Sequence, residues 1–555
     1  MTVTIQSISP RVTSIDGLSD AISGATTVFL GAGSGTAPST GDNNTAVGID
    51  SLKLNTTGAS NAALGFSALY SNTEGAYNTA AGSSALANNT TGLANTAVGF
   101  SALISNLTGA HNVALGYQAL YFNTGSYNMA VGGNALSANT SGSNNSAVGY
   151  YALNGNTTGV YNSGIGSEAL RFNTTGTYNT AIGYQALRTN TTGDNNVAIG
   201  ATALYGNTTG FTNTAIGLSA LYTNSTGEAN TAMGAYALYT NSTGGSNTAI
   251  GNMTLYYNTT GYNNTAQGWR ALISNTTGHS NVAVGYTSLA YNTTGDNNSA
   301  VGINALYSNT TGASNAAWGS SALFSNTTGS NNTGIGPQTL YSNTTASDLT
   351  AIGYTALYSN VTGAGGTAIG FQSLYSSTAN YNSAVGYYSL KANTSGANNS
   401  AFGYQAGYAG TANTTGSNNT YLGYSAQSNA NNYSNSTALG ASAVITASNQ
   451  IVYGDGNVTE NKFTGKFNVP TTIITPGTTG AATIDKMAGR VNIAAAGTSV
   501  VVTNSIVTAD SIIIATAATN DGTGVVKNVV AGAGSFTINI VACTAETAIN
   551  FIVIN

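Results

Sequence analysis

The feature that most constrains the fold is a repeat that returns every 17 residues. A glycine that ends a short apolar segment recurs from Gly48 to Gly440, in 24 copies over about 400 residues. Two of the steps are 16 residues long, one is 20, and the others are 17. Close repetition at a fixed period is typical of a solenoid, in which each copy packs only against its neighbours.

Turn-forming residues divide each copy. A unit of 17 residues is too short for a helical repeat, which needs about 30. Each copy contains a corner such as Asn190-Thr191-Thr192-Gly193, and a second Asn, such as Asn179, precedes the apolar segment. Because Asn and Gly tolerate positive φ, both places predict tight corners with two short strands between them. The copies should therefore form a flattened parallel β-roll.

The repeated Asn side chains lead to a further prediction. An Asn amide donates and accepts at once, so stacked Asn side chains should form ladders along the roll axis. Sugar binding by these amides is the alternative interpretation.

Two positions of the repeat hardly vary. Ala or Gly stands two residues before the glycine in every copy except that of Tyr421, and Leu stands four residues after it in the first 21 copies. A constant small residue opposite a constant Leu predicts the interior of a thin coil. The structural core is represented by Ala198, Gly200, Leu204, Ala215, Gly217 and Leu221.

A third position is apolar but variable. The residue just before the glycine includes Ile199, Met233, Trp318 and Gln267, and alternation along a strand places it opposite the buried Ala. A continuous apolar stripe outside the coil would be a large exposed patch unless identical chains bury it, which favours a parallel homotrimer. With one turn per strand spacing, 24 turns would extend roughly 115 Å.

Composition excludes several classes of protein. Only 5% of the 555 residues are charged and the net charge is −5, with the Lys and Arg residues scattered, so no nucleic-acid groove is expected. A hydrophobic content of 41%, in strict register, indicates order. The single cysteine, Cys543, is interpreted as a small buried hydrophobe rather than a reactive thiol. No secretory signal and no membrane-spanning stretch are evident, so folding in a cytoplasm and no membrane insertion are expected.

The repeat also sets the expected domain boundaries. Residues 41–452 form the β-roll shaft, and residues 1–40, which include a possible short helix at 11–23, form an attachment or trimer-initiation segment. Residues 453–486 form a connector. Residues 487–555 lack the period and contain alternating β-branched runs split by Gly and Asn, which predicts a compact antiparallel β domain. The fold class is therefore all-β.

The repeat resembles a known family. Its "N-T/S-A-V/I-G-x-x-A-L" core is similar to that of trimeric autotransporter adhesin heads, although those use about 14 residues per turn. The 17-residue form, followed by "NQIVYGDGNVTENKFTG", more closely resembles tail-fibre proteins of tailed bacteriophages. "MAGRVNIAAAGTSVVVTNSIVTADSIIIATAATNDGTGVV" and "GAGSFTINIVACTAETAINFIVIN" are similar to a terminal domain of viral fibres.

The resemblance implies a virion tail fibre assembled in the host cytoplasm. Its N-terminus would attach to phage tail or baseplate proteins, and its C-terminal domain would bind a host surface glycan or protein. Loops around Asn520, Asp521 and Gly522 have the composition of exposed turns and are the candidate receptor-binding residues. The alternatives are an exported bacterial trimeric adhesin and a polysaccharide-degrading tail spike.

Candidate catalytic residues are few. Acids in the shaft, such as Glu168, Asp194 and Asp296, fall in separate copies, whereas glycoside hydrolysis needs two carboxylates about 5–10 Å apart. Asp455 and Glu460 are close in sequence but are interpreted as part of a solvated connector. His111 and His279 are interpreted as surface variation, without a Ser-His-Asp arrangement. No enzyme activity, cofactor or metal site is expected.

Aromatic residues also recur. The position five residues after the glycine carries Tyr in many copies, for example Tyr205, Tyr222 and Tyr239. Stacking between neighbouring turns is the favoured interpretation, and a glycan-binding track is the alternative.

Overall fold

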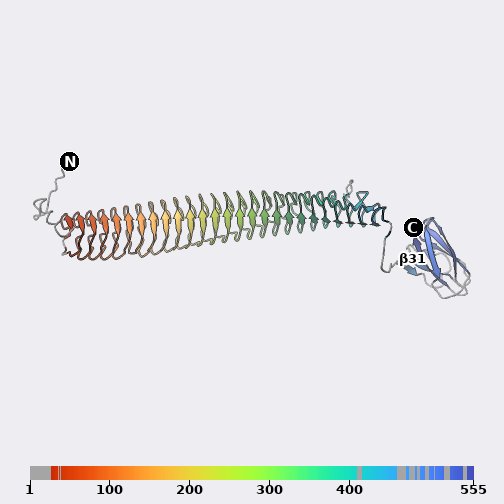
Figure 1. Cartoon of the computed structure of the whole chain (residues 1–555), viewed down its shortest axis with the longest axis horizontal. Helices are drawn as coiled ribbons and strands as arrows, with labels where there is room; N and C mark the ends of the chain where they lie inside the picture. The colour runs from red at the N-terminus through yellow and green to blue at the C-terminus, as the bar shows by residue number, and fades with distance from the viewer. Residues whose placement is uncertain are drawn as a thin grey trace. The chain divides into compact units, whose positions relative to one another are not determined.

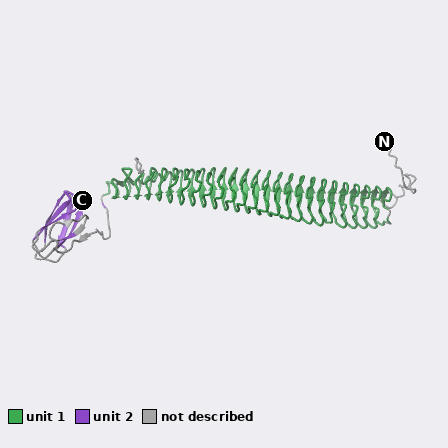
Figure 2. Cartoon of the chain, turned by 180° about the vertical axis from the view of Figure 1, so that it is seen from behind, with its two compact units in different colours: residues 1–458 green, residues 459–555 purple. Residues whose placement is uncertain are grey.

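The computed structural model divides the chain into two compact units, Met1–Val458 and Thr459–Asn555 (Figure 2). The residues that the structure describes are 27–35, 37, 39–408, 415–458, 460, 471–473, 482–483, 488–493, 499–504, 507–509, 511–517, 525–541 and 547–554. All regular elements among them are β-strands, as the sequence predicts.

The first unit is a β-solenoid built on one parallel sheet of 26 strands (Figure 1). Each strand pairs in register with the corresponding strand of the next coil, so that Ala181 lies beside Ala198 and Ala198 beside Ala215. The strands are β1 Val28–Leu30, β2 Thr45–Val47, β3 Ala62–Leu64, β4 Thr79–Ala81, β5 Thr96–Val98, β6 Val113–Leu115, β7 Met129–Val131, β8 Ser146–Val148, β9 Ser163–Ile165, β10 Thr180–Ile182, β11 Val197–Ile199, β12 Thr214–Ile216, β13 Thr231–Met233, β14 Thr248–Ile250, β15 Thr265–Gln267, β16 Val282–Val284, β17 Ser299–Val301, β18 Ala316–Trp318, β19 Thr333–Ile335, β20 Thr350–Ile352, β21 Thr367–Ile369, β22 Ser383–Val385, β23 Ser400–Phe402, β24 Thr420–Leu422, β26 Thr437–Leu439 and β28 Ile451–Tyr453.

The solenoid extends past the boundaries expected from the repeat. Strand β1 already pairs with β2, so the sheet begins before residue 41, and β28 closes it at residue 453. At a strand spacing of about 4.8 Å, 26 strands extend about 120 Å.

The expectation of two strands per copy is wrong for most of the solenoid. Each of these coils has one three-residue strand, and the rest of the coil consists of consecutive turns. Left-handed backbone explains the difference, because Thr202 has a φ of 55° and Leu204 a φ of 54°. These residues still bond from coil to coil, as Leu204 N donates to Ala220 O at 2.9 Å. Only β25 (Gln427–Ser428) and β27 (Val444–Ile445) form a second, two-stranded sheet.

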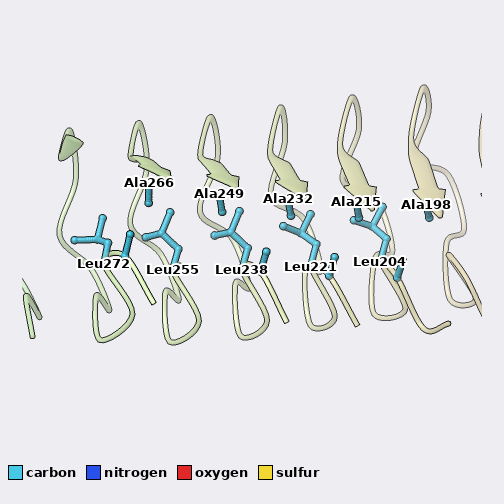
Figure 3. Close-up of a cluster of buried hydrophobic side chains, with 14 of the residues drawn as sticks. Ala198, Leu204, Ala215, Leu221, Ala232, Leu238, Ala249, Leu255, Ala266 and Leu272 are labelled. Carbon is cyan, nitrogen blue, oxygen red and sulfur yellow. The ribbon is translucent and has the colours of Figure 1, made fainter. Parts of the chain in front are cut away.

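The predicted core is confirmed for its Ala and Leu positions, whereas Gly200 and Gly217 are half-buried. Ala198, Leu204, Ala215 and Leu221 are fully buried, and Figure 3 shows the Ala side chains facing the Leu side chains across the coil. The fit is tight, because a Cβ added at Gly164, which takes the Ala position, would lie 3.3 Å from the Cγ of Leu153 in the preceding coil. The interior of a typical coil therefore holds two small side chains, such as Ala198 and Ala203, and one large one, such as Leu204.

An exchange near the end of the solenoid shows the same volume limit. Gly407 takes the Leu position, and Tyr421 takes the Ala position of the next coil. Tyr421 is fully buried, and a Cβ added at Gly407 would lie 3.0 Å from its Cδ2. A large residue at the usually small position thus fills the volume that the missing Leu leaves.

Two Asn ladders run along the solenoid, as predicted. In the corner ladder, Asn207 Nδ2 donates to Asn190 Oδ1 at 2.8 Å and to Gly210 O at 2.9 Å. In the strand ladder, the backbone N of Asn213 donates to Asn196 Oδ1 at 3.0 Å, and Asn213 Nδ2 donates to Gly227 O at 2.8 Å. These amides are buried, and their bonds satisfy corner carbonyls that the fold removes from water.

The explanation for the corner glycine needs correction. Positive φ was expected there, yet it occurs instead at the strand-ending glycines, such as Gly200 with a φ of 129° and Gly217 with a φ of 131°. The corner glycine Gly210 is crowded instead, since a Cβ would lie 2.3 Å from Asn207 Oδ1 and 2.4 Å from Gly227 O. Another copy carries Ala346 at this position and keeps the bond from Asn343 Nδ2 to its carbonyl at 3.1 Å, so a small shift of the ladder admits one methyl group.

In its described residues, the second unit contains two four-stranded sheets, one with the order β29-β31-β36-β33 and one with the order β30-β32-β35-β34. Among the strands described there, four of the six pairs are antiparallel, as predicted, while β29 and β30 pair in parallel. These two strands come from residues expected to form the connector. The strands are β29 Thr471–Ile473, β30 Ala482–Thr483, β31 Ala488–Ile493, β32 Ser499–Thr503, β33 Ile512–Ala517, β34 Val526–Gly532, β35 Ser535–Ile540 and β36 Thr547–Ile554.

Apolar residues from both sheets form the core of this unit. Val502, Phe536 and Ile538 come from one sheet, and Ile549 and Phe551 from the other, and all are buried. The rings of Phe536 and Phe551 meet edge to face with their centroids 4.8 Å apart. The unit is a small β-sandwich.

Candidate functional site

An apolar column follows the outside of the parallel sheet. We call it the outer stripe, defined as the residue just before each strand-ending glycine from Val47 to Leu439. It is half-buried or exposed along the solenoid, with exposed fractions of 57% for Leu64, 39% for Ile182 and 51% for Trp318. The predicted outward direction is confirmed. An apolar surface of this length exceeds what a soluble chain normally leaves in water.

A second column stacks aromatic rings on one another. In the side column, five residues after the glycine, Tyr205, Tyr222, Tyr239 and Tyr256 stack with centroids 5.0–5.1 Å apart. A similar run extends from Tyr307 to Tyr375. The predicted stacking is confirmed. Because each ring covers the face of the next, these runs expose edges rather than the faces on which a sugar would stack.

A third column is aromatic and more exposed, and sequence reasoning missed it. In the edge column, directly after the glycine, stacked rings lie 5.1–5.5 Å apart from Tyr354 to Tyr424. Further pairs in this column are Phe100 with Tyr117 and Trp269 with Tyr286. Aligning the copies on the glycine would have revealed it, because the column contains Phe, Tyr or Trp in many copies.

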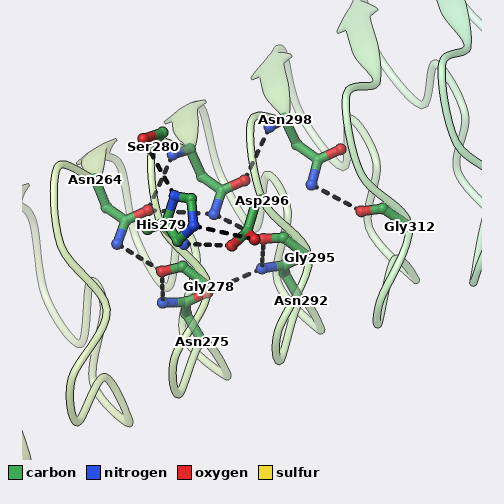
Figure 4. A network of polar contacts seen from close by, with 11 residues as sticks. Asn264, Asn275, Gly278, His279, Ser280, Asn292, Gly295, Asp296, Asn298 and Gly312 are labelled. Atoms are coloured by element: carbon green, nitrogen blue, oxygen red, sulfur yellow. Dashed lines mark hydrogen bonds and ion pairs between the residues drawn. The ribbon is translucent and has the colours of Figure 1, made fainter.

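One contact set departs from the expectation for the histidines. His279 Nε2 lies 3.2 Å from Asp296 Oδ2 in the next coil, and His279 Nδ1 lies 3.3 Å from Ser280 Oγ (Figure 4). A Ser, a His and an Asp are therefore in contact, which sequence reasoning did not find. The 17-residue period could have shown it, since His279 and Asp296 occupy the same position in successive copies.

The repeat gives this cluster a structural role. Asp296 Oδ1 accepts the backbone N–H of His279 at 2.8 Å, and Asp194 Oδ1 accepts that of Thr177 at 2.6 Å. Ser330 Oγ accepts the N–H of Ala313 in the same way. A polar residue at this position therefore links its coil to the preceding one. The His279 ring stacks on Tyr262 at 4.6 Å, which continues the coil-to-coil packing.

The densest group of charges lies on two coils in the first half of the solenoid. The carboxylate of Glu168 lies 2.6 Å from Arg188 Nε and 3.3 Å from Arg171 Nη1, and it accepts a bond from Gln185 Nε2 at 3.2 Å. The bond from Arg188, in particular, holds the pKa of Glu168 below its ordinary value. Both guanidinium groups also lie over aromatic rings, as Arg171 does over Tyr151 at 4.7 Å.

Asp455, Glu460 and His111 are the remaining candidate residues that the structure describes. Asp455 accepts bonds from the backbone N and Nδ2 of Asn457, which lower the pKa of its carboxyl group. It belongs to the first unit and Glu460 to the second. His111 stacks on Tyr127 with centroids 5.0 Å apart. Asn520, Asp521, Gly522, Cys543 and the possible helix at residues 11–23 lie outside the described residues.

Among the described residues, no three His, Cys, Asp or Glu side chains are grouped as a metal site would require. The same part of the chain contains no helix with the length and apolar character needed to span a bilayer.

No protein-family model matches the chain. No curated protein matches it either.

Proposed function

We propose that the chain is a homotrimeric fibre of a tailed-phage virion that carries host recognition. The observation that supports this most is the outer stripe on a solenoid of 26 strands that bond coil to coil. Such a sheet resists bending because each coil is fixed to its neighbours by main-chain bonds and two Asn ladders. A stiff element about 120 Å long suits a spacer between an anchoring point and a target.

Trimer formation would explain why the outer stripe is apolar. In a parallel arrangement around a threefold axis, each coil lies at the same height as its copies, so the stripes would face one another. Side chains such as Ile182 and Trp318, exposed in a single chain, would then be buried. Their variable size fits packing around an axis better than packing inside a closed coil.

The C-terminal sandwich is the proposed recognition domain. It lacks the repeat, so its loops can form a shaped site, and three copies would bind a repetitive surface glycan with avidity. The segment at residues 1–40 is proposed to attach the fibre to phage tail or baseplate proteins. The exported adhesin and the polysaccharide-degrading spike remain the competing functions.

The trimer is tested by sedimentation of the purified full chain. The wild type should sediment as a trimer, and the double variant Ile199→Glu/Ile216→Glu as a monomer, because charges on the outer stripe would oppose association. The control is Thr192→Glu/Thr209→Glu, which places the same charges on exposed corner positions of the same coils and should leave the trimer intact. A monomeric wild type would contradict the proposal.

The virion role is tested separately. Mass spectrometry of phage particles should detect the chain as a structural component. The variant Asn520→Ala/Asp521→Ala should lose adsorption to host cells while remaining trimeric. Release of shortened glycan from host capsule by the wild-type protein would instead favour the degrading spike.

A further inference from the structure

The outer stripe contains one polar residue. Of its 24 positions from Val47 to Leu439, all but one carry Ala, Val, Ile, Leu, Met, Phe or Trp, and the exception is Gln267. Gln267 ends strand β15 and pairs with Ile250 and Val284 of the adjacent coils. Its side chain is exposed, and its amide bonds to none of the residues that the structure describes. The amide is therefore available to a group outside the chain.

The spacing of the outer stripe limits what can cover it. The stripe repeats at the coil spacing of about 4.8 Å, and the sheet stays in register even across a 16-residue step, where Val113 pairs with Met129. A globular partner would match this spacing over only a few coils. Further copies of the same chain would match it at every coil, which favours them as the occupants.

A uniform stripe leaves the register of such an assembly weakly defined. Two of its runs consist of isoleucine only, namely Ile165, Ile182, Ile199 and Ile216 and then Ile335, Ile352 and Ile369. Sliding one chain by one coil would bring equivalent surfaces together again over most of the length. The largest residue, Trp318, is held against its own chain, because its Nε1 donates to Ser299 Oγ at 3.1 Å.

Gln267 can supply the missing reference point. A primary amide both donates and accepts, so three copies around a threefold axis can each donate to one neighbour and accept from the other. A slip of one coil would place this amide against the Ile250 or Val284 side chains of the other copies and leave its hydrogen bonds unmade. A single polar residue in an apolar interface fixes the register of coiled coils by the same penalty.

We propose that Gln267 sets the register of the homotrimer, through a ring of hydrogen bonds among its three copies at the threefold axis. The inference rests on the trimer of the proposed function and adds the residue that aligns its chains. The two can fail separately. A monomeric wild type in sedimentation contradicts the trimer, whereas a trimer that is indifferent to the position of Gln267 contradicts only the register.

Moving the polar residue in one of two chains tests the proposal. The variant Gln267→Ile/Met233→Gln carries its Gln two coils, or about 10 Å, nearer the N-terminus. When it is coexpressed with a differently tagged wild type, mixed trimers should be at least tenfold rarer than random assembly predicts, because the Gln residues of the two chains no longer lie level. Native mass spectrometry counts the mixed trimers.

Two controls accompany this experiment. The moved variant should still form trimers with itself, since all of its Gln residues lie level again. Met233→Leu keeps Gln267 in place and should mix with the wild type at random. Random mixing of the moved variant with the wild type would overturn the proposal.

Removing the polar residue from every chain tests the opposite case. In a Cys543→Ser background, one chain carries Val284→Cys and a second, differently tagged chain carries Val301→Cys in the next coil. In level chains these cysteines lie one coil apart as well as across the interface, so a disulfide between them requires a slip of one coil. Adding Gln267→Leu to both chains should raise the disulfide yield at least threefold, and an unchanged yield would contradict the assigned role.

Thermal stability separates alignment from ordinary packing. Gln267→Leu should leave the thermal midpoint of the trimer unchanged or higher, because replacing all three amides by apolar side chains leaves no unpaired polar group. Leu64 and Leu115 already occupy the same position in other coils. A lower midpoint would show that Gln267 holds the trimer together rather than aligning it, and would overturn the assignment.

Discussion

Asn207 donates through Nδ2 to the Oδ1 of Asn190 in the preceding coil, at 2.8 Å, and its own Oδ1 accepts from Asn224 in the following coil at the same distance. Each amide of the corner ladder thus serves two neighbours at once. Since these groups are buried, their bonds hold adjacent coils in a single relative position.

Removing one rung of the ladder should destabilise the solenoid. Asn207→Ala would lose the bonds to Asn190 and Gly210 and leave the Nδ2 of Asn224 without its acceptor in the ladder. A loss of about 2–4 kcal/mol is expected in chemical denaturation, because buried unpaired donors are costly. The exposed Thr209→Ala in the same corner should change stability by less than about 0.5 kcal/mol. Equal effects would contradict the ladder's role.

The corner position should tolerate no side chain larger than the methyl group of Ala346, which holds this position in one copy. Gly210→Leu would extend a side chain beyond a Cβ that already meets Asn207 Oδ1 and Gly227 O. A marked fall in the thermal midpoint is expected from this contact. Gly210→Ala provides the comparison, because Ala346 and Ala379 hold the same position in other copies. Comparable melting of both variants would show that contact with the ladder is not the constraint.

The cost of replacing the buried Leu should depend on the shape of the new side chain and not only on its volume. Leu221 has a φ of 56°, a conformation that strongly disfavours β-branched side chains. Leu221→Ile should therefore cost more than about 2 kcal/mol, whereas Leu221→Met should cost less than about 1.5 kcal/mol. Urea denaturation of the two variants measures the difference, and an isoleucine variant as stable as the methionine variant would refute the argument.

The Glu168 cluster should make stability depend on pH. Its pKa is lowered from an ordinary value of 4.5, chiefly by the bond from Arg188, so the folded chain favours the ionised form. The stabilisation is complete above that value and is lost as the pH falls through the lowered pKa. The difference in melting temperature between the wild type and Glu168→Gln should thus shrink from pH 7 to pH 3. A constant difference would exclude the linkage.

The sequence predicted the core because the repeat compares 24 versions of one coil within a single chain. Positions such as Ala198 and Leu204 hold constant volume, and the structure confirms their burial. Comparison of the copies could not show that the expected second strand of each coil is absent. Turn propensity located the corners, but left-handed backbone at residues such as Thr202 and Leu204 is uncommon for these types, so propensity pointed to a strand.

The sequence could predict a polar contact only where two polar residues occupy the same position in successive copies of the repeat. Asp296 follows His279 by one full copy, and this spacing alone places them in adjacent coils. Glu168 and Arg188 lie 20 residues apart, and their contact depends on side-chain reach that the period does not describe. The aromatic residues of the edge column could be recognised in the sequence. That their rings stack and cover one another's faces is known only from the structure.

The in-register pairing of each strand with the next affects how the length of the solenoid can evolve. Each coil presents to its successor nearly the same surface that it receives from its predecessor, as Ala181, Ala198 and Ala215 illustrate. Loss or duplication of one 17-residue unit would rejoin two compatible coils and create no new junction. The length of the first unit can therefore evolve in discrete steps of about 4.8 Å, independently of the sequence of the C-terminal sandwich.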